Sequence, residues 1–152
     1  MNILIVEDDP DKKNSIVKFI ESLKLDISVT EKESINSGLR EILFRSDLSL
    51  IILDMSMSID DVTSEDPEGG GHESFAGKKF LEHMYLRGIK IPVIVVSQFG
   101  SFGKGMNKIS LPLLDQELLD KHPDFYLGAI YYNSAMDEWK SELKEIIMKV
   151  GS

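Results

Sequence analysis

Cysteine is missing from this chain of 152 residues, and its absence excludes disulfides, thiolate metal sites and cysteine nucleophiles. Positive charge is also scarce, because 17 lysines and arginines stand against 26 aspartates and glutamates and give a formal net charge of −9. Phosphate backbones repel such an acidic surface unless basic residues are segregated on it. The lysine clusters of this chain are short, so we expect no direct binding of nucleic acid.

Long apolar runs are missing as well. No run approaches the ~18 residues of a membrane-spanning helix, and the N-terminal sequence MNILIVEDD carries acids where a signal peptide needs a basic start. We therefore expect no membrane segment and a cytoplasmic location. The length suits a single domain, spanning residues 1–152, with a hydrophobic core of its own.

Apolar residues gather instead in five short runs, at residues 3–6, 27–29, 48–53, 91–96 and 127–132. The first, third and fourth runs are almost continuous, which is typical of parallel strands covered on both faces. Helical spacing of apolar residues predicts helices at 11–23, 34–45 and 77–87, in the second half of 111–122, and from 136 onward. This alternation predicts an α/β fold, in which helices cover both faces of a doubly wound parallel sheet.

Two segments, at about 57–76 and 98–125, are too long for simple connections, and we interpret them as insertions. The first contains GGGH at 69–72, which we interpret as a linker because the acids around it would repel a phosphate. The second begins with QFGSFGKG, a predicted flexible entry to a helix. Its large apolar side chains exceed the needs of one short helix, so we expect a partner-binding surface there.

Acids follow two of the almost continuous runs at the point where each ends. Glu7 and Asp8 follow the first run, and Asp54 follows the third. Because ligands bind outside the carboxyl ends of parallel strands, these acids predict a single site at one edge of the sheet. Carboxylates held together repel one another, and a hard divalent cation such as Mg²⁺ offsets that repulsion. Ser97 ends the fourth run and brings a hydroxyl to the same edge.

These motifs resemble those of receiver domains of two-component response regulators. ILIVEDD resembles the first strand of that family with its acidic pair, LIILDM the third strand with its phosphoacceptor, and IPVIVVS the fourth strand with its hydroxyl residue. The resemblance implies a flavodoxin-like fold of five parallel strands in the order 2-1-3-4-5. It implies that Asp54 is the phosphoacceptor and Ser97 the phosphoryl-sensing hydroxyl. It also implies a Mg²⁺ site formed by Glu7, Asp8, Asp54 and the backbone carbonyl of Ser56, with Asp9 near a helix start.

The chain departs from the family pattern at the end of the fifth strand, where the family has a lysine that binds the phosphoryl group. Asn133 or Ser134 stands there, so the switch aromatic position falls on Ile130 or Tyr131. We consider Asn133 as the replacement for the lysine. The alternative is a lysine of the lengthened segment, Lys104 or Lys108. Ser58 stands where the family has a proline after the phosphoacceptor.

We therefore expect an atypical response regulator receiver, a phosphoprotein of two-component signal transduction. It would accept a phosphoryl group on Asp54 with Mg²⁺, from a histidine kinase or another phosphodonor. We expect the final helix to cover the sheet and to leave no room for a DNA-binding output domain, so signalling would pass to a partner protein through residues 98–132. We expect no enzymatic activity beyond slow autodephosphorylation.

Two alternatives remain open. The first is a pseudo-receiver, a binding module that uses the fold without phosphorylation, and the missing lysine and the two insertions favour it. The second is a small metal-dependent phosphohydrolase. Such enzymes usually have a second acid two residues after the nucleophile, and Ser56 occupies that position here.

Overall fold

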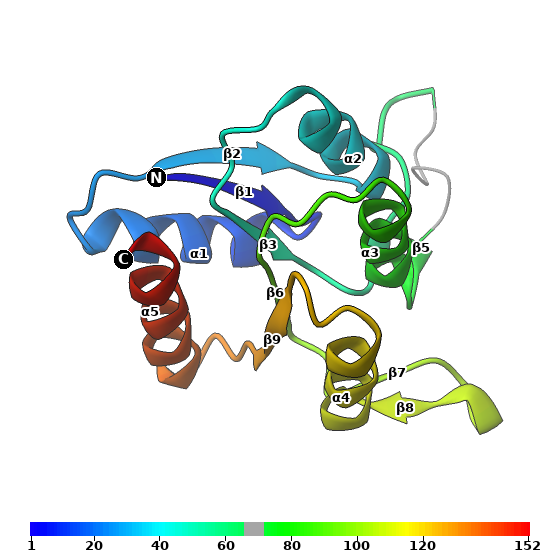
Figure 1. Ribbon diagram of the computed structural model, residues 1–152. Coiled ribbons are helices and arrows are strands. Elements are labelled where there is room, and N and C mark those ends of the chain that lie inside the picture. The colour runs from blue at the N-terminus through cyan, green and yellow to red at the C-terminus, as the bar shows by residue number, and fades with distance from the viewer. Residues whose placement is uncertain (66–71) are drawn as a thin grey trace.

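The computed structural model describes residues 1–65 and 72–152, and its centre is a sheet of five parallel strands (Figure 1). The strands lie in the order β2-β1-β3-β6-β9, which is the predicted order 2-1-3-4-5 of the main strands. Their bounds are β1 Asn2–Val6, β2 Ser28–Lys32, β3 Leu50–Leu53, β6 Val93–Ser97 and β9 Tyr126–Tyr131. The fold prediction is confirmed.

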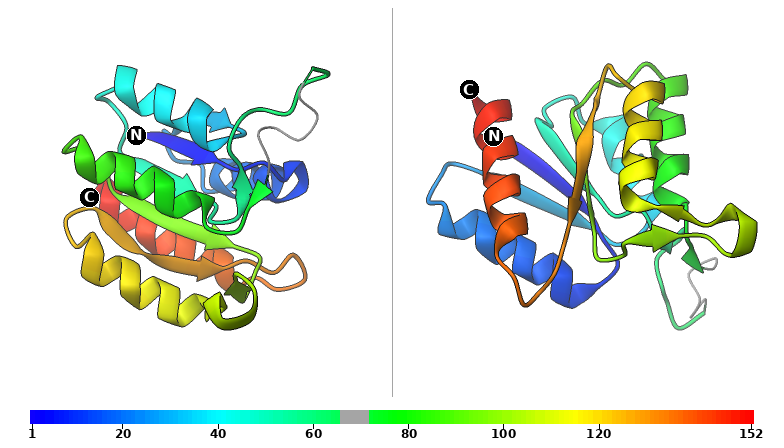
Figure 2. Two further views of the ribbon diagram at one scale, coloured as in Figure 1. Left: turned by 90° about the vertical axis from the view of Figure 1, so that its right-hand side faces the viewer. Right: turned by 90° about the horizontal axis from the view of Figure 1, so that it is seen from below.

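Within the described residues, five α-helices cover the two faces of this sheet (Figure 2). Helices α1 (Pro10–Ser22) and α5 (Glu138–Gly151) pack on one face, where Ile16 and Leu143 join Ile3 and Ile5 in one core cluster. The other face is covered by α2 (Ile35–Phe44), α3 (Ala76–Leu86) and α4 (Leu111–Lys121). No helix among the residues described is both long and apolar enough to cross a membrane.

The almost continuous apolar runs follow from this arrangement. Successive side chains of a strand point to opposite faces, so Ile3 and Ile5 enter one core cluster while Leu4 and Val6 enter the other. Both faces are covered, and both sets are therefore buried. The register pairs Val6 with Leu53, so the acids that follow these two residues emerge side by side at the same edge.

The first long segment returns to the sheet edge through a short antiparallel pair that the sequence did not predict. Strand β4 (Met57–Ser58) pairs with β5 (His72–Glu73), with Ser58 opposite His72. The glycines of the GGGH motif, at 69–71, lie outside the described residues. The pairing fixes the chain a few residues after Asp54 and brings Ser58 toward the acidic edge.

The second long segment differs from the expected irregular entry. It forms a hairpin of β7 (Ser101–Phe102) and β8 (Ile109–Ser110) around the 3₁₀ turn η1 (Gly105–Asn107), and this hairpin extends away from the sheet (Figure 2). A left-handed conformation at Gly103 (φ 84°) permits the turn. The predicted start of the following helix was wrong, because α4 begins at Leu111, where Ser110 Oγ accepts from Leu113 N–H.

Candidate functional site

The acids predicted to converge lie together at the carboxyl ends of β1 and β3. One carboxylate oxygen from each of Glu7, Asp8 and Asp54 lies within 4.8 Å of the other two. Glu7 and Asp54 are buried, and Asp8 is half-buried. Such a concentration of negative charge is unfavourable on its own, so its neighbours decide what the cluster can do.

Lys12, from the first turn of α1, is buried inside this cluster with 2% of its surface exposed. Its Nζ lies 3.1 Å from Glu7 Oε1 and 3.3 Å from Asp54 Oδ1. The ammonium also donates a hydrogen bond to the carbonyl oxygen of Val96 at 2.5 Å. Helix α1 thus contributes one positive charge to the acidic site. From the sequence, this helix was predicted only to cover the sheet.

A signal for Lys12 was present in the sequence. Positions 12, 16 and 20 are spaced by four residues and share one face of the predicted helix, and the apolar Ile16 and Ile20 mark that face as the one turned to the core. Asp9 sets the helix start, because its Oδ1 accepts from Asp11 N–H at 3.0 Å and from Lys12 N–H at 3.4 Å. A helix beginning at Pro10 therefore turns Lys12 toward the sheet edge. The expectation that Asp9 lies at a helix start is confirmed.

The other two carboxylates of the cluster are held by backbone donors. Asp54 Oδ1 accepts from Met55 N–H at 2.8 Å, in addition to facing Lys12. Asp8 Oδ2 accepts from Ser58 twice, from its N–H at 3.1 Å and from its hydroxyl at 3.2 Å. Ser58 therefore positions Asp8. In the sequence, this residue stood out only because the family has a proline at its position.

Glu7 is the least satisfied group of the site. It is 2% exposed, and neither of its carboxylate oxygens has a well-formed hydrogen bond to the described residues. Burial, together with the adjacent Asp54 carboxylate, raises the pKa of Glu7 to about 10, although Lys12 opposes the rise. Glu7 therefore holds a proton unless another cation joins the cluster.

A divalent cation fits these residues. Both oxygens of Glu7 lack a hydrogen bond to the described residues, although Oε1 forms an ion pair with Lys12, and three converging carboxylates provide the hard oxygen donors that Mg²⁺ prefers. Three ionised carboxylates and one ammonium leave two negative charges in excess, which a divalent cation neutralises. Ser56, the predicted carbonyl ligand, is buried two residues after Asp54, and its role as a ligand stays a prediction.

The remaining predicted residues lie apart from these contacts. Ser97 is fully buried at the end of β6, where its Oγ donates to Phe99 O at 3.1 Å and accepts from Phe99 N–H at 3.0 Å. Asn133 is exposed, and its Oδ1 accepts from Ala135 N–H within its own turn. Lys104 and Lys108 are exposed on the hairpin. Within the described part of the chain, the ion pair of Asp54 is made by Lys12.

Comparison with known proteins finds relatives of this chain. No family model matches the chain. It is 34% identical over 146 residues to the uncharacterized protein y4jR of Sinorhizobium fredii, covering 95% of both chains. It is 27% identical over 143 residues to the Detocs response regulatory protein DtcB of Enterobacter cloacae, covering 94% of this chain and 95% of the other.

Solved receiver structures have the same fold. The response regulator RcsB, in its complex with DNA, superimposes with a TM-score of 0.66 at 17% identity, covering 98% of this chain and 61% of the RcsB chain. The receiver domain of the sensor histidine kinase PA1611 from Pseudomonas aeruginosa gives 0.59 at 19% identity over 99% and 98%, and that structure has a magnesium ion in its active site cleft. The chain belongs to one family with y4jR, and its fold is that of response regulator receiver domains. This receiver lacks the fifth-strand lysine and carries the acidic triad typical of the family's Mg²⁺ site.

Proposed function

We propose that this receiver accepts a phosphoryl group on Asp54 with the help of Mg²⁺ and signals through protein contact. The observation that carries the proposal is the convergence of Asp54, Glu7 and Asp8, with carboxylate oxygens within 4.8 Å of one another, around a buried ammonium. The magnesium bound by PA1611 supports a cation at the same edge of the fold. The similarity to response regulators supports a histidine kinase, or another phosphodonor, as the source of the phosphoryl group.

The contacts of Asp54 suggest how the transfer proceeds. Its Oδ1 is engaged by Met55 N–H and Lys12, so we assign Oδ2 as the attacking atom. A P–O bond to Asp54 forms as the P–N bond of a phosphohistidine breaks, and the released imidazole nitrogen takes a proton from solvent. Bound Mg²⁺ supplies charge neutralisation for the transferring oxygens. The buried Ser97 hydroxyl, at the end of the adjacent strand β6, would then donate to the phosphoryl group in place of the Phe99 carbonyl.

Incubation with Mg²⁺ and acetyl phosphate tests this proposal. Intact-mass spectrometry should detect one added phosphoryl group, and peptide mapping after borohydride reduction should place it on Asp54. Asp54→Asn should abolish the adduct, and a chelator should prevent its formation in the wild type. An adduct that persists in Asp54→Asn, or no adduct in the wild type, would refute the assignment.

A second candidate function is a phosphorylation-independent binding module. The ion pair between Lys12 and Asp54 favours it, because the carboxylate already has a buried partner. Trp139 is a natural reporter: it contacts Phe19 of α1 and Tyr132, and Lys12 Nζ lies 6.0 Å from the Tyr132 ring centre. A Trp139 fluorescence response to beryllofluoride that requires Mg²⁺ would support the phosphoryl-accepting receiver, and no response would support the binding module.

Signalling through residues 98–132 is the remaining part of the proposal. Phe99, Met106, Leu113 and Tyr131 expose apolar surface there, and a partner protein would bury it. Replacing the hairpin turn 103–107 by two glycines should leave Mg²⁺ binding and the acetyl phosphate adduct unchanged. It should weaken association with a kinase or effector from the same genome. Equal association by both proteins would place the partner surface elsewhere.

A further inference from the structure

Lys12 occupies a position that neither helix formation nor packing explains. It lies in the first turn of α1, where the positive end of the helix dipole disfavours a cation. Burial of an ammonium adds a desolvation cost unless it is paired and hydrogen-bonded. Position 12 shares its face with Ile16 and Ile20, so an apolar residue would serve the core equally well. The charge of the lysine is compensated by Glu7 and Asp54 of the acidic site and by the carbonyl oxygen of Val96.

Its neighbour Lys13 provides an internal comparison. Lys13 Nζ reaches away from the site, to Glu33 Oε1 at 2.8 Å and Glu31 Oε1 at 3.9 Å, and both glutamates are exposed. Two adjacent lysines on one helix therefore serve different purposes. Lys13 forms surface ion pairs, and Lys12 is directed into the cluster that contains Asp54.

The Lys12 ammonium lies near the end of β9, where the family lysine is missing, and supplies a positive charge there. Asn133, beyond that strand, is exposed and engaged in its own turn. Lys12 Nζ is bonded to the carbonyl of Val96, the residue before Ser97 on β6, and also lies near the ring of Tyr132 beyond β9. The ammonium thus sits among the ends of β3, β6 and β9, on the Ser97 side of Asp54. It reaches this place from α1.

We propose that Lys12 replaces the missing fifth-strand lysine as the residue that binds the phosphoryl group on Asp54. This inference rests on the proposed phosphorylation of Asp54. When Asp54 becomes an acyl phosphate, it loses its own negative charge and gains phosphoryl oxygens at the same place. The ammonium, 3.3 Å from Asp54 Oδ1 before transfer, exchanges that partner for a phosphoryl oxygen. The site then keeps three acids, one lysine and one hydroxyl, with the lysine supplied by a different element.

Three variants test the role of Lys12. Lys12→Met removes the charge and keeps the length of the side chain, Lys12→Arg keeps the charge, and Lys13→Met is the matched control. With acetyl phosphate and Mg²⁺, Lys12→Met should form the Asp54 adduct at least about tenfold more slowly, and Lys12→Arg should recover part of the rate. Lys13→Met should react as the wild type does. Wild-type rates in Lys12→Met would overturn the proposal while leaving phosphorylation of Asp54 intact.

A second measurement separates this role from metal binding and from folding. Mg²⁺ titrated against Trp139 fluorescence, without a phosphodonor, should bind Lys12→Met at least as tightly as the wild type, because a competing positive charge is gone. Loss of Mg²⁺ affinity in a folded Lys12→Met would count against the inference. Lys12→Met leaves the buried Glu7 carboxylate without its ion pair. If this variant does not fold for that reason, the double variant Glu7→Gln/Lys12→Met is used instead, with Glu7→Gln alone as its reference.

If the wild type forms no adduct, the proposed function fails first. In that case, Mg²⁺-dependent beryllofluoride binding by Lys12→Met at wild-type affinity would overturn the role of Lys12 as well.

Discussion

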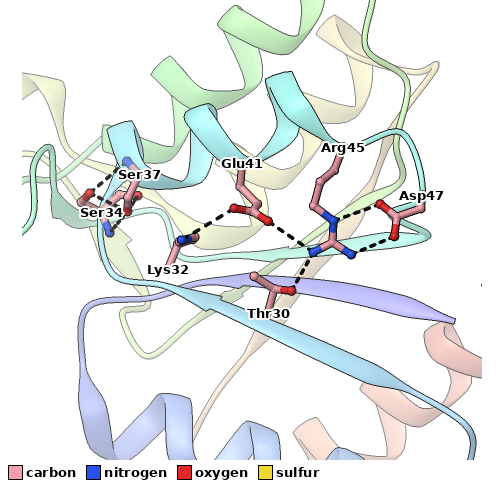
Figure 3. A network of polar contacts seen from close by, with 7 residues as sticks. All are labelled: Thr30, Lys32, Ser34, Ser37, Glu41, Arg45 and Asp47. Atoms are coloured by element: carbon pink, nitrogen blue, oxygen red, sulfur yellow. Dashed lines mark hydrogen bonds and ion pairs between the residues drawn. The ribbon is translucent and has the colours of Figure 1, made fainter.

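Two polar networks of this molecule are built on opposite principles. On the β2–α2 side, Arg45 donates to Asp47 at 2.9 Å, to Thr30 at 2.7 Å and to Glu41 at 3.3 Å (Figure 3). Lys32 pairs with the second oxygen of Glu41, and Ser34 and Ser37 cap the start of α2. In this network the side chains satisfy one another, because each charge faces an opposite charge and each of these donors has an acceptor.

The cluster at the ends of β1 and β3 is not complete in this way. It has three carboxylates for one ammonium, and the oxygens of Glu7 are buried without hydrogen bonds to the described residues. A buried group in this condition lowers stability, whereas partly exposed ion pairs such as those of Arg45 change it little. The comparison teaches that folding accounts for the Arg45 network, whereas the acidic cluster has unsatisfied groups that the proposed cation and phosphoryl group would complete.

The largest effect is expected from a change that displaces the acidic edge through the backbone. Gly77, in the first turn of α3, donates its N–H to Met55 O at 2.8 Å. A Cβ at this position would lie 3.0 Å from Asp54 O and 3.0 Å from Met55 Cα. We expect Gly77→Ala to lower the free energy of unfolding by about 1–2 kcal/mol and to slow formation of the acetyl phosphate adduct.

Gly38→Ala is the matched control for this overpacking. Its Cβ would lie 2.9 Å from Val6 Cγ2 and 3.1 Å from Phe80 Cε2, in the core between α2 and the sheet. Urea unfolding should show a similar loss of stability, with adduct formation at the wild-type rate. Equal rates in the two alanine variants would show that the position of the Asp54 backbone does not limit transfer.

The second prediction removes one charge from each network. Glu7→Gln should raise the Mg²⁺ dissociation constant by about tenfold, or 1.4 kcal/mol, because a buried carboxylate without hydrogen bonds is replaced by a neutral amide. Its free energy of unfolding in a chelator should not fall. Glu41→Gln, in the Arg45 network, should leave Mg²⁺ affinity unchanged in the same Trp139 titration. A drop in Mg²⁺ affinity in both variants would mean a general charge effect.

The sequence was sufficient to predict the parts of this molecule that depend on local pattern. Continuous apolar runs gave the buried strands, and the acids that end them gave Glu7 and Asp54 at one edge, because parallel strands share the direction of their carboxyl ends. Lys12 was missed for a physical reason. A lysine near a helix start normally lies in solvent. The Lys12 side chain points into the acidic cluster because of where the start of α1 lies in three dimensions.

The hairpin β7–β8 and the pair β4–β5 were also missed. Each strand has two residues, too short for any alternation of apolar and polar side chains to be visible. Their positions depend on contacts with distant residues. Phe102 is buried beside Phe75 and Phe99, and Ser58 is fixed by Asp8. Such contacts carry no periodic signal in the sequence.

A third prediction concerns His122, a second buried polar residue, and tests whether the lack of a hydrogen-bond partner is enough to mark a residue as functional. His122 is buried between the rings of Phe125 and Tyr85, and its Nδ1 has no hydrogen bond to the described residues. Burial lowers the pKa of His122, Lys121 lowers it further, and Glu82 opposes the shift. The folded state therefore binds fewer protons at this residue. Its contribution to stability is present above the ordinary pKa of about 6.5 and declines as the pH falls below that value.

His122→Phe should remove this part of the pH dependence and leave Mg²⁺ affinity unchanged. Urea unfolding between pH 7.5 and pH 5.5, on the wild type and the variant, measures the difference. The wild type should lose more stability over this interval, beyond the loss from carboxylates that the two proteins share. Identical slopes would show that His122 is protonated as easily in the folded chain as in the unfolded one.

The smallest effect is expected in the network that is already complete. Arg45→Ala removes the guanidinium that joins Thr30, Glu41 and Asp47, all of which can turn to solvent. Exposed ion pairs contribute little because water screens them and side-chain entropy opposes them. The thermal midpoint should fall less than in Gly77→Ala, and less still at high salt. The Mg²⁺ affinity and the rate of adduct formation should equal those of the wild type. A change in either would mean that the α2 side communicates with Asp54, and the separation of the molecule into a structural network and a functional cluster would then fail.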